Sequence, residues 1–231
     1  MQWSTPKKPA EITEERLIEA ILNKDFPPNS NLPGERELAV QLGVTRPTLR
    51  EALQRLGRDG WVEINQGKPT RVCNYLEEGN LAVLAELARH QGDLPENFVH
   101  NLLEVRELLA PAYTQAAVVS APDVIKEALE ECLDLPDEAE AFARADWHLH
   151  HLCTVHSGNP IFTLILNGFQ DLYPVMGEIY FRNPAGRKAS REFYAGLLKS
   201  IEAGDADLAR QITETAMQRA AELWQSPRKG K

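Results

Sequence analysis

Two short helical patterns, followed by a glycine-tipped hairpin, constrain the first third of this 231-residue chain most strongly. A helix from about Ala10 to Leu22 comes first, and the pattern GERELAVQL comes next. Thr45 is a good N-cap for a further helix, whose buried side is marked by Leu49 and Leu56. The period then changes to two strands, WVEI and TRVC, around a turn with Gly67 at its tip. The sequence therefore predicts a helix-turn-helix with a two-stranded wing.

Charge is distributed unevenly along the chain. Residues 1 to 75 carry a net charge of +1 and residues 76 to 231 a net charge of -10, which gives the -9 of the whole chain. A chain this acidic does not coat nucleic acid by bulk attraction. Between residues 36 and 71, however, positive side chains exceed negative ones by three. A phosphate-binding face is therefore possible in the N-terminal segment alone.

The N-terminal end of the second helix of the pair is the candidate reading element, because this end normally leads into the major groove of DNA. The planar fork of arginine can bind guanine bidentately, and threonine hydroxyls can bind phosphates or base edges. An arginine at the start of the preceding helix can touch phosphate, and the wing tip can reach the minor groove. The alternative is an ordinary solvated helix. The candidate DNA-binding residues are Arg36, Thr45, Arg46, Thr48, Arg50, Gln66, Gly67 and Lys68.

From Asn80 onward, repeated helical spacing and few strand signals indicate an antiparallel bundle. Breaks at GDLP, SAPD, DLPD, SGNP, NPAG and AGD predict six or seven helices, and Pro111 is expected to kink or divide one of them. The predicted fold class is mainly α. It combines a winged helix-turn-helix DNA-binding domain over residues 1–75 with an all-α effector-binding and dimerisation-competent domain over 76–231. The segment from Cys73 to Gly79 is the expected lever between them.

The residues of the first domain carry a family resemblance. The run LPGERELAVQLGVTRPTLREALQRLGRDGWVEINQGKPT resembles the DNA-binding domain of the GntR family of bacterial transcription factors, whose signature runs LPxERELAxxLGVxRxTxREAL. The stretches RDGWVEINQGKPTRVCNY, SGNPIFTLILNG and YFRNPAGR resemble the FadR type within that family, and the likeness extends from about Glu14 to Trp224. Pro47 and Gln66 stand where this type usually has threonine and histidine, which implies an altered operator preference. The implied DNA contacts are Arg36, Thr45, Arg46, Thr48, Arg50 and Gly67.

The resemblance implies a homodimeric regulator that binds double-stranded operator DNA. Such regulators repress genes of fatty acid degradation, activate genes of fatty acid biosynthesis and are released from DNA by long-chain acyl-CoA. The acyl-CoA is an effector, so neither a cofactor nor an enzymatic activity is expected. The longest apolar runs, 116–119 and 161–166, fall far short of the ~20 residues that cross a membrane, and the N-terminus lacks the apolar core of a signal peptide. We therefore expect a cytoplasmic protein with no membrane partner.

A long alkyl chain needs an apolar tunnel with a polar mouth, which a helical bundle can hold between its helices. The resemblance places Arg106 near the ligand, with a salt bridge as the open alternative, and Lys229 can meet CoA phosphates or belong to a solvated tail. In the last helix, Met217, Arg219 and Ala220 replace a glycine, a glutamate and a serine of the FadR type. Arg219 can still pair with a phosphate, whereas Met217 adds bulk. The candidate lining residues, each of which also fits an ordinary core position, are Leu103, Phe169, Tyr173, Tyr180 and Trp224.

Asp146 and His150 lie four residues apart, on one face of a predicted helix. Many relatives use such a pair with two later histidines to hold a divalent metal. Tyr194 and Ala216 stand in the place of those histidines, so no metal is expected and the pair is interpreted as hydrogen-bonded. Two alternatives remain open. The first is a metal-assisted regulator that responds to a small carboxylate. The second is an enzyme for acyl thioesters, although no nucleophile elbow, P-loop or dinucleotide turn accompanies the pair.

Overall fold

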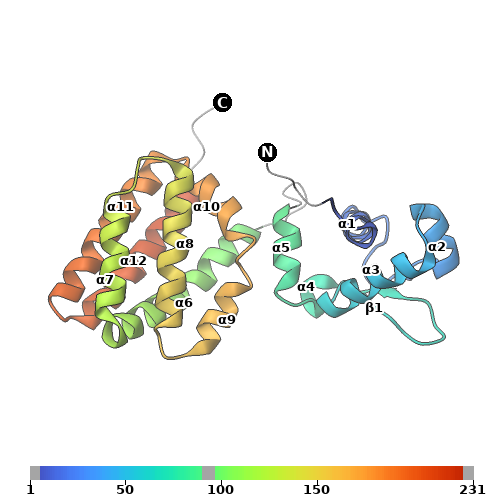
Figure 1. The fold of residues 1–231 in the computed structure, drawn as a ribbon, viewed down its shortest axis with the longest axis horizontal. Coiled ribbons are helices and arrows are strands. Elements are labelled where there is room, and N and C mark those ends of the chain that lie inside the picture. The colour runs from blue at the N-terminus through green and yellow to red at the C-terminus, as the bar shows by residue number, and fades with distance from the viewer. Residues whose placement is uncertain (1–5, 90–96, 226–231) are drawn as a thin grey trace. The chain divides into compact units, whose positions relative to one another are not determined.

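The computed structural model describes residues 6–89 and 97–225, and in that part of the chain the fold is mainly helical, as predicted (Figure 1). Contacts divide the chain into two compact units, Met1–Leu94 and Pro95–Lys231. Two helices that begin at or after residue 75 lie in the first of these units. The functional domain boundary expected after residue 75 stays a prediction. Among the described residues, no helix is long and apolar enough to cross a membrane.

The first unit contains the predicted helix-turn-helix and its wing. Both helices begin and end where local signals place them. Gly43 ends the first in the left-handed conformation, with φ +68°, and the Thr45 hydroxyl caps the second by accepting the Thr48 N–H at 3.3 Å. The elements are α1 (Pro9–Leu22), α2 (Glu35–Leu42), α3 (Arg46–Asp59), β1 (Val62–Glu63), β2 (Arg71–Val72), α4 (Tyr75–Glu78) and α5 (Ala82–Arg89).

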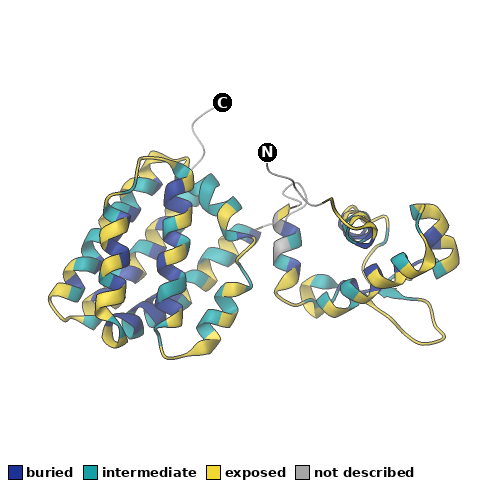
Figure 2. Ribbon diagram, viewed as in Figure 1, coloured by how far each residue is buried: buried dark blue, intermediate teal, exposed yellow. Residues whose placement is uncertain are grey.

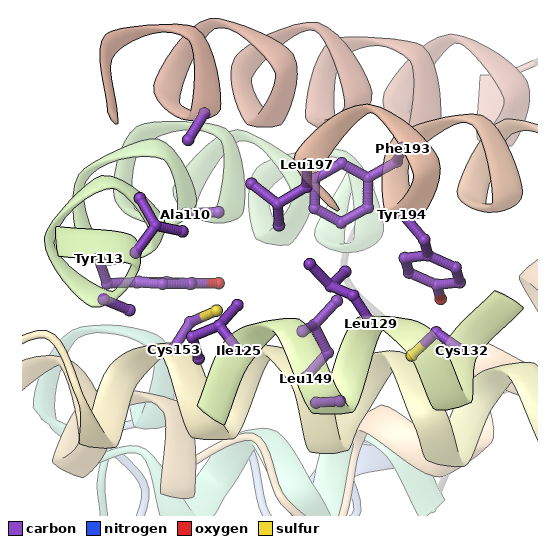
Figure 3. Close-up of a cluster of buried hydrophobic side chains, with 14 of the residues drawn as sticks. Ala110, Tyr113, Ile125, Leu129, Cys132, Leu149, Cys153, Phe193, Tyr194 and Leu197 are labelled. Carbon is purple, nitrogen blue, oxygen red and sulfur yellow. The ribbon is translucent and has the colours of Figure 1, made fainter. Parts of the chain in front are cut away.

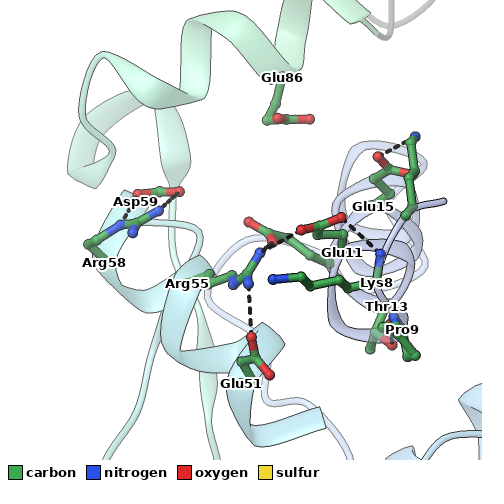
Figure 4. Close-up of polar contacts among 12 residues, drawn as sticks. Lys8, Pro9, Glu11, Thr13, Glu15, Glu51, Arg55, Arg58, Asp59 and Glu86 are labelled. Carbon is green, nitrogen blue, oxygen red and sulfur yellow. Dashed lines mark hydrogen bonds and ion pairs between the residues drawn. The ribbon is translucent and has the colours of Figure 1, made fainter. Parts of the chain in front are cut away.

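Helices α1 and α3 pack against each other to form the core of the first unit. Their apolar faces are fully buried, with Leu17 and Leu49 among the residues at 0% exposure. At the edge of this contact, Arg55 of α3 lies 2.8 Å from Glu51 of the same helix (Figure 4). It also lies 3.5 Å from Glu14 of α1. Burial raises the pKa of the Glu14 carboxyl. Helix α3 is thus fixed to α1 by both apolar and ionic contacts.

The wing is a two-stranded antiparallel hairpin in which Val62 pairs with Val72. Gly67 at its tip has φ +71°, a conformation that favours glycine. The segment before α2, whose prolines and asparagines favour a loop, also pairs with β2. The Val72 N–H donates to the Ser30 carbonyl, and the Leu32 N–H donates to the Thr70 carbonyl, both at 2.8 Å. Strand β2 is therefore covered on both edges.

Helix α4 lies within the expected lever segment and is fastened to the winged helix. Arg71 donates to Glu78 at 2.6 Å, and this hydrogen bond, together with one from the backbone, lowers the pKa of Glu78 to about 2. The rings of Trp61 and Tyr75 lie 4.8 Å apart. A Cβ added to Gly60, which has φ +89°, would stand 2.6 Å from the Gly79 Cα. The segment from Cys73 to Gly79 is therefore part of the first unit.

The second unit is a bundle of seven helices in its described part. Helix α12 packs along α6 and α11, and α10 packs along α8. Pro111 does not divide α6, which continues through it. Counting α5, eight described helices follow Asn80 rather than six or seven, because the break between α9 and α10 contains no proline and was not predicted. The elements are α6 (Phe98–Ser120), α7 (Pro122–Leu133), α8 (Ala139–Val155), α9 (Pro160–Asn167), α10 (Tyr173–Phe181), α11 (Pro184–Glu202) and α12 (Ala206–Gln225).

Buried and exposed positions alternate around the helices of both units, as amphipathic spacing requires (Figure 2). In the second unit the core brings Tyr113 of α6, Cys153 of α8 and Tyr194 of α11 to its centre (Figure 3). Burial raises the pKa of the Cys153 thiol to about 12, so this cysteine stays protonated and inert. Two of these core residues also carry hydroxyls, which they direct to a buried polar cluster.

Candidate functional site

The N-terminal turn of α3 brings together four of the predicted DNA-binding residues. The Thr45 and Thr48 hydroxyls lie 2.8 Å apart, and the side chains of Arg46 and Arg50 are 56% and 58% exposed. Glu35, the first residue of α2, faces both arginines. Its Oε2 lies 2.8 Å from Nε of Arg50 and 3.7 Å from Nη2 of Arg46. The turn presents two hydroxyls and two guanidinium groups to solvent.

The other four predicted DNA-binding residues lie elsewhere on the same unit. Arg36 is exposed in the first turn of α2. Gln66, Gly67 and Lys68 are exposed at the wing tip, where the Lys68 N–H donates to the Asn65 carbonyl at 3.4 Å. Among the described residues, no hydrogen bond or ion pair joins the wing tip to α3. Their roles as DNA contacts stay predictions.

The second unit contains an apolar cavity bordered by helices α6, α8, α9, α10 and α12. The space between its side chains, with the solvent at its mouth included, measures ≈ 980 Å³. Its surface is mostly aliphatic and aromatic, and Arg106, Tyr113 and His150 add polar groups. Six of the predicted ligand-binding residues line this cavity: Leu103, Arg106, Phe169, Tyr173, Tyr180 and Trp224.

Among the remaining predicted ligand-binding residues, Met217 and Arg219 do not line this cavity. Met217 lines a smaller one, which shares Arg106 and Tyr180 with the first. Arg219 is exposed and pairs with Glu222 at 2.8 Å. Lys229 lies outside the described residues, and its contact with CoA phosphates stays a prediction. The bulk of Met217 therefore fills space beside the large cavity rather than within it.

Sequence reasoning missed most of the apolar lining. Helix α9 shows why, since none of its residues is buried although its sequence PIFTLILN is almost wholly apolar. Phe162, Ile165 and Leu166 line the cavity, and Phe162 also packs against Tyr113 of the core. The almost wholly apolar sequence of this short helix was the available signal for a cavity wall.

A buried polar cluster adjoins the large cavity and joins four helices. Arg106 of α6 donates from Nη2 to Asp146 of α8 at 2.7 Å, and the same nitrogen lies 2.7 Å from Nε2 of His150. The Asp146 carboxylate, which is buried, also accepts the hydroxyl of Tyr194 at 3.0 Å and that of Tyr173. Arg106 thus lines the cavity and also makes the salt bridge that the sequence left open as an alternative.

The contacts of His150 fix its protonation and its tautomer. Arg106 can only donate, so Nε2 of His150 accepts, and Nδ1–H is left to donate to the Tyr113 hydroxyl at 2.8 Å. Burial, and then the positive charge of Arg106, lowers the pKa of His150 to about 4. Burial alone would raise the pKa of Asp146, but the positive charge of Arg106 and the hydroxyl of Tyr173 lower it. The cluster is an ion pair with a neutral histidine.

The guanidinium of Arg106 lies where a metal would have to bind. Oδ2 of Asp146 and Nε2 of His150 are 3.9 Å apart and converge on the same guanidinium nitrogen. Tyr194 uses its hydroxyl on Asp146, and Ala216, which lines the smaller cavity, has no donor atom. No group of three or more His, Cys, Asp or Glu side chains placed to hold a metal occurs in the described part of the chain.

Both units match sequence families of transcription regulators. Residues 9–72 match the family described as bacterial regulatory proteins, gntR family, and residues 73–230 match the FadR C-terminal domain. The chain is 42% identical over 218 residues to the fatty acid metabolism regulator protein of Erwinia tasmaniensis, a match that covers 94% of this chain and 92% of that protein. It is 41% identical over 218 residues to the protein of the same name from Klebsiella pneumoniae, covering 94% and 91%.

A solved structure, described as "Lar controls the expression of the Listeria monocytogenes agr system and mediates virulence", shares the fold. It superposes with a TM-score of 0.61 at 19% identity over 95% of this chain and 98% of that one. At this identity the likeness shows the fold alone. The sequence matches show more, because together they span both units. The chain belongs to the GntR family of bacterial transcription regulators and carries the FadR type of C-terminal domain.

Proposed function

We propose that this protein is a DNA-binding transcription regulator of fatty acid metabolism that long-chain acyl-CoA releases from its operator. It would act as a homodimer in the cytoplasm, repressing genes of fatty acid degradation and activating genes of fatty acid biosynthesis. The names of the relatives support the regulated process. The observation that supports a long-chain acyl effector is the apolar cavity of the second unit. No cofactor and no catalytic step enter the proposal.

DNA binding is assigned to the N-terminal turn of α3. Arg46 and Arg50 project into solvent from the end of the helix that leads into the major groove in such motifs. Each guanidinium can bind guanine through two parallel hydrogen bonds. Arg36, in the first turn of α2, is positioned for phosphate, and Lys68 in the wing for the adjacent groove. Dimeric operators are near-palindromic because the protein dimer is two-fold symmetric.

Acyl-chain binding is assigned to the large cavity because its surface has the required chemistry. An alkyl chain gains free energy from leaving water and needs no polar partner, and the lining of the cavity is almost entirely apolar side chains. The CoA head group carries phosphates and belongs at the mouth, in solvent. Trp224 lines the cavity from α12, whereas Met217 of the same helix lines the smaller one. The departure at Met217 therefore does not oppose an acyl ligand.

Release from DNA requires two states of the dimer. An effector shifts the equilibrium only if it binds the state without DNA more tightly, and each tenfold preference is worth about 1.4 kcal/mol. The cavity touches Arg106, Tyr173 and His150, which belong to the buried cluster that joins four helices. An acyl chain that moves these side chains would change the packing of the whole bundle.

The deciding experiment is a gel-shift titration on a FadR-type operator, with and without oleoyl-CoA, at one fixed salt concentration because phosphate contacts make affinity steeply salt-dependent. We expect tight binding that oleoyl-CoA reverses. Tight binding that oleoyl-CoA leaves unchanged would overturn the assignment of acyl-CoA as the effector but keep the assignment of the protein as a DNA-binding regulator. No preference for the operator over a scrambled duplex would overturn the regulator itself.

A variant separates the two halves of the proposal. Arg46→Ala removes one base-reading guanidinium and should weaken operator binding by about 1–3 kcal/mol. It should leave the rise in melting temperature on adding oleoyl-CoA unchanged, because Arg46 belongs to the first unit and the cavity to the second. Loss of both responses would mean that the substitution had damaged the fold, which circular dichroism would show directly.

A further inference from the structure

Glu35 is a carboxylate set among side chains that are expected to meet the negative backbone of DNA. It is the first residue of α2, where the positive end of the helix dipole favours an acidic side chain. Its Oε2 lies 2.8 Å from Nε of Arg50 and 3.7 Å from Nη2 of Arg46. Arg46 and Arg50 of α3 therefore share one counter-ion, Glu35.

This placement opposes binding of the DNA backbone. Sequence-independent affinity comes almost entirely from cations that neutralise phosphates, so a carboxylate at this position weakens it. The neighbouring acid Glu37, in the same first turn, shows that proximity alone does not produce the contact. Its Oε1 accepts from Gln41 at 3.2 Å on the exposed side of α2, and no ion pair links it to a described arginine. Glu35 therefore makes a specific contact with Arg50 and Arg46.

Glu35 contacts Nε of Arg50, and the choice of this atom indicates that Glu35 orients the guanidinium. Arg50 gives Nε to the carboxylate, and neither Nη1 nor Nη2 makes a hydrogen bond with a described residue. Bidentate reading of guanine O6 and N7 requires two parallel N–H donors from one guanidinium, which these two nitrogens can supply. A carboxylate bonded at Nε holds the plane of the guanidinium while leaving its outer edge free.

We propose that Glu35 is a positioning residue that sets sequence discrimination. It holds Arg50 in the orientation that reads guanine, and its negative charge weakens binding to any duplex regardless of sequence. This inference rests on the proposed function, because it assumes that α3 reads DNA. Glu35 itself touches no base. Its contribution therefore appears in the ratio of operator affinity to non-specific affinity more than in operator affinity alone.

Three variants separate position from charge. Glu35→Gln removes the charge and the ion pair, Glu35→Asp keeps the charge but shortens the reach to Arg50, and Glu37→Gln removes an equal charge from the same turn. We expect the ratio of operator to scrambled-duplex affinity to fall about fivefold or more in both Glu35 variants, the lower range of what a bidentate pair contributes. Glu37→Gln should keep the native ratio.

The experiment measures affinity by fluorescence anisotropy for an operator that the native protein has selected from random duplexes, and for a scrambled duplex, at several salt concentrations. For the scrambled duplex, Glu35→Gln should also steepen the salt dependence by up to about one counter-ion, and Glu35→Asp should not. Helix content by circular dichroism confirms that each variant is folded.

The outcomes distinguish this inference from the proposed function. If native protein selects no operator, the proposed function fails. If native protein discriminates and Glu35→Asp does so equally well, the positioning role is overturned and Glu35 contributes charge only. Equal ratios in native protein and Glu35→Gln overturn the whole inference. A double variant gives an independent check, because Arg50→Ala should cost less operator affinity in the Glu35→Gln background than in native protein.

Discussion

His150 is the group whose protonation should destabilise the second unit at low pH. Its imidazole is buried, and burial together with the charge of Arg106 lowers its pKa from 6.5 to about 4. Between these two values the folded protein keeps His150 neutral, whereas the unfolded chain binds a proton there. The stabilisation is therefore fully present above pH 6.5 and is lost as the pH falls toward 4. Because a tenfold change in equilibrium is worth about 1.4 kcal/mol, the loss is about 3 kcal/mol.

Two variants on the same helix test this magnitude. His150→Gln retains an acceptor for Arg106 but does not titrate, and His148→Gln makes the same exchange at an exposed position. Urea unfolding is followed by circular dichroism between about pH 7 and about pH 4, at fixed protein concentration because the protein is expected to be a dimer. We expect the fall in unfolding free energy to shrink by about 3 kcal/mol in His150→Gln and to stay unchanged in His148→Gln. An equally steep fall in His150→Gln would refute the buried neutral histidine.

Two further substitutions follow from the packing. Arg106→Met should lower the unfolding free energy by about 3–5 kcal/mol, because it leaves the buried carboxylate of Asp146 without its cation. Adding Asp146→Asn should recover part of that loss in urea titrations, and a further decrease would contradict the assignment. Gly60→Ala should lower the melting temperature, since its Cβ would stand 2.6 Å from the Gly79 Cα at φ +89°. Gly57→Ala, whose nearest contact is 3.5 Å, should not, and equal melting temperatures for the two variants would count against the close approach.

Local signals explain why the reading helix was predictable. The Thr45 cap, the left-handed Gly43 and the apolar positions of α3 each depend on residues a few positions apart, and the structure confirms the helices that they predict. The pairing of the Ser30 segment with β2 was not predictable, because it depends on backbone hydrogen bonds across about forty residues of chain. Turn-forming residues indicated a loop there, and tertiary pairing gave it a defined edge.

The candidate site was predictable in part for a similar reason. Leu103 and Tyr173 were candidate lining residues that also fitted an ordinary core position, because periodicity cannot tell a packed core position from a cavity wall. In the sequence, Arg106 could be a ligand contact or a salt-bridge partner; the structure shows the salt bridge and places Arg106 on the cavity lining, and its contact with a ligand stays a prediction. The hydroxyls of Tyr113 and Tyr194 were missed because their partners lie on another helix, and only the packing of α6, α8 and α11 brings them together.

The fastening of α4 to the winged helix determines how this protein can be recombined. A chimera that joined its N-terminal part to a foreign sensor at residue 75 would separate Arg71 from Glu78 and remove the chain that packs on Gly60. Val83 and Leu87 of α5, which are buried in the same unit, would be lost with it. The portable DNA-binding module is therefore the chain through α5, and a graft made after that helix keeps the contacts of α4 and α5 described above.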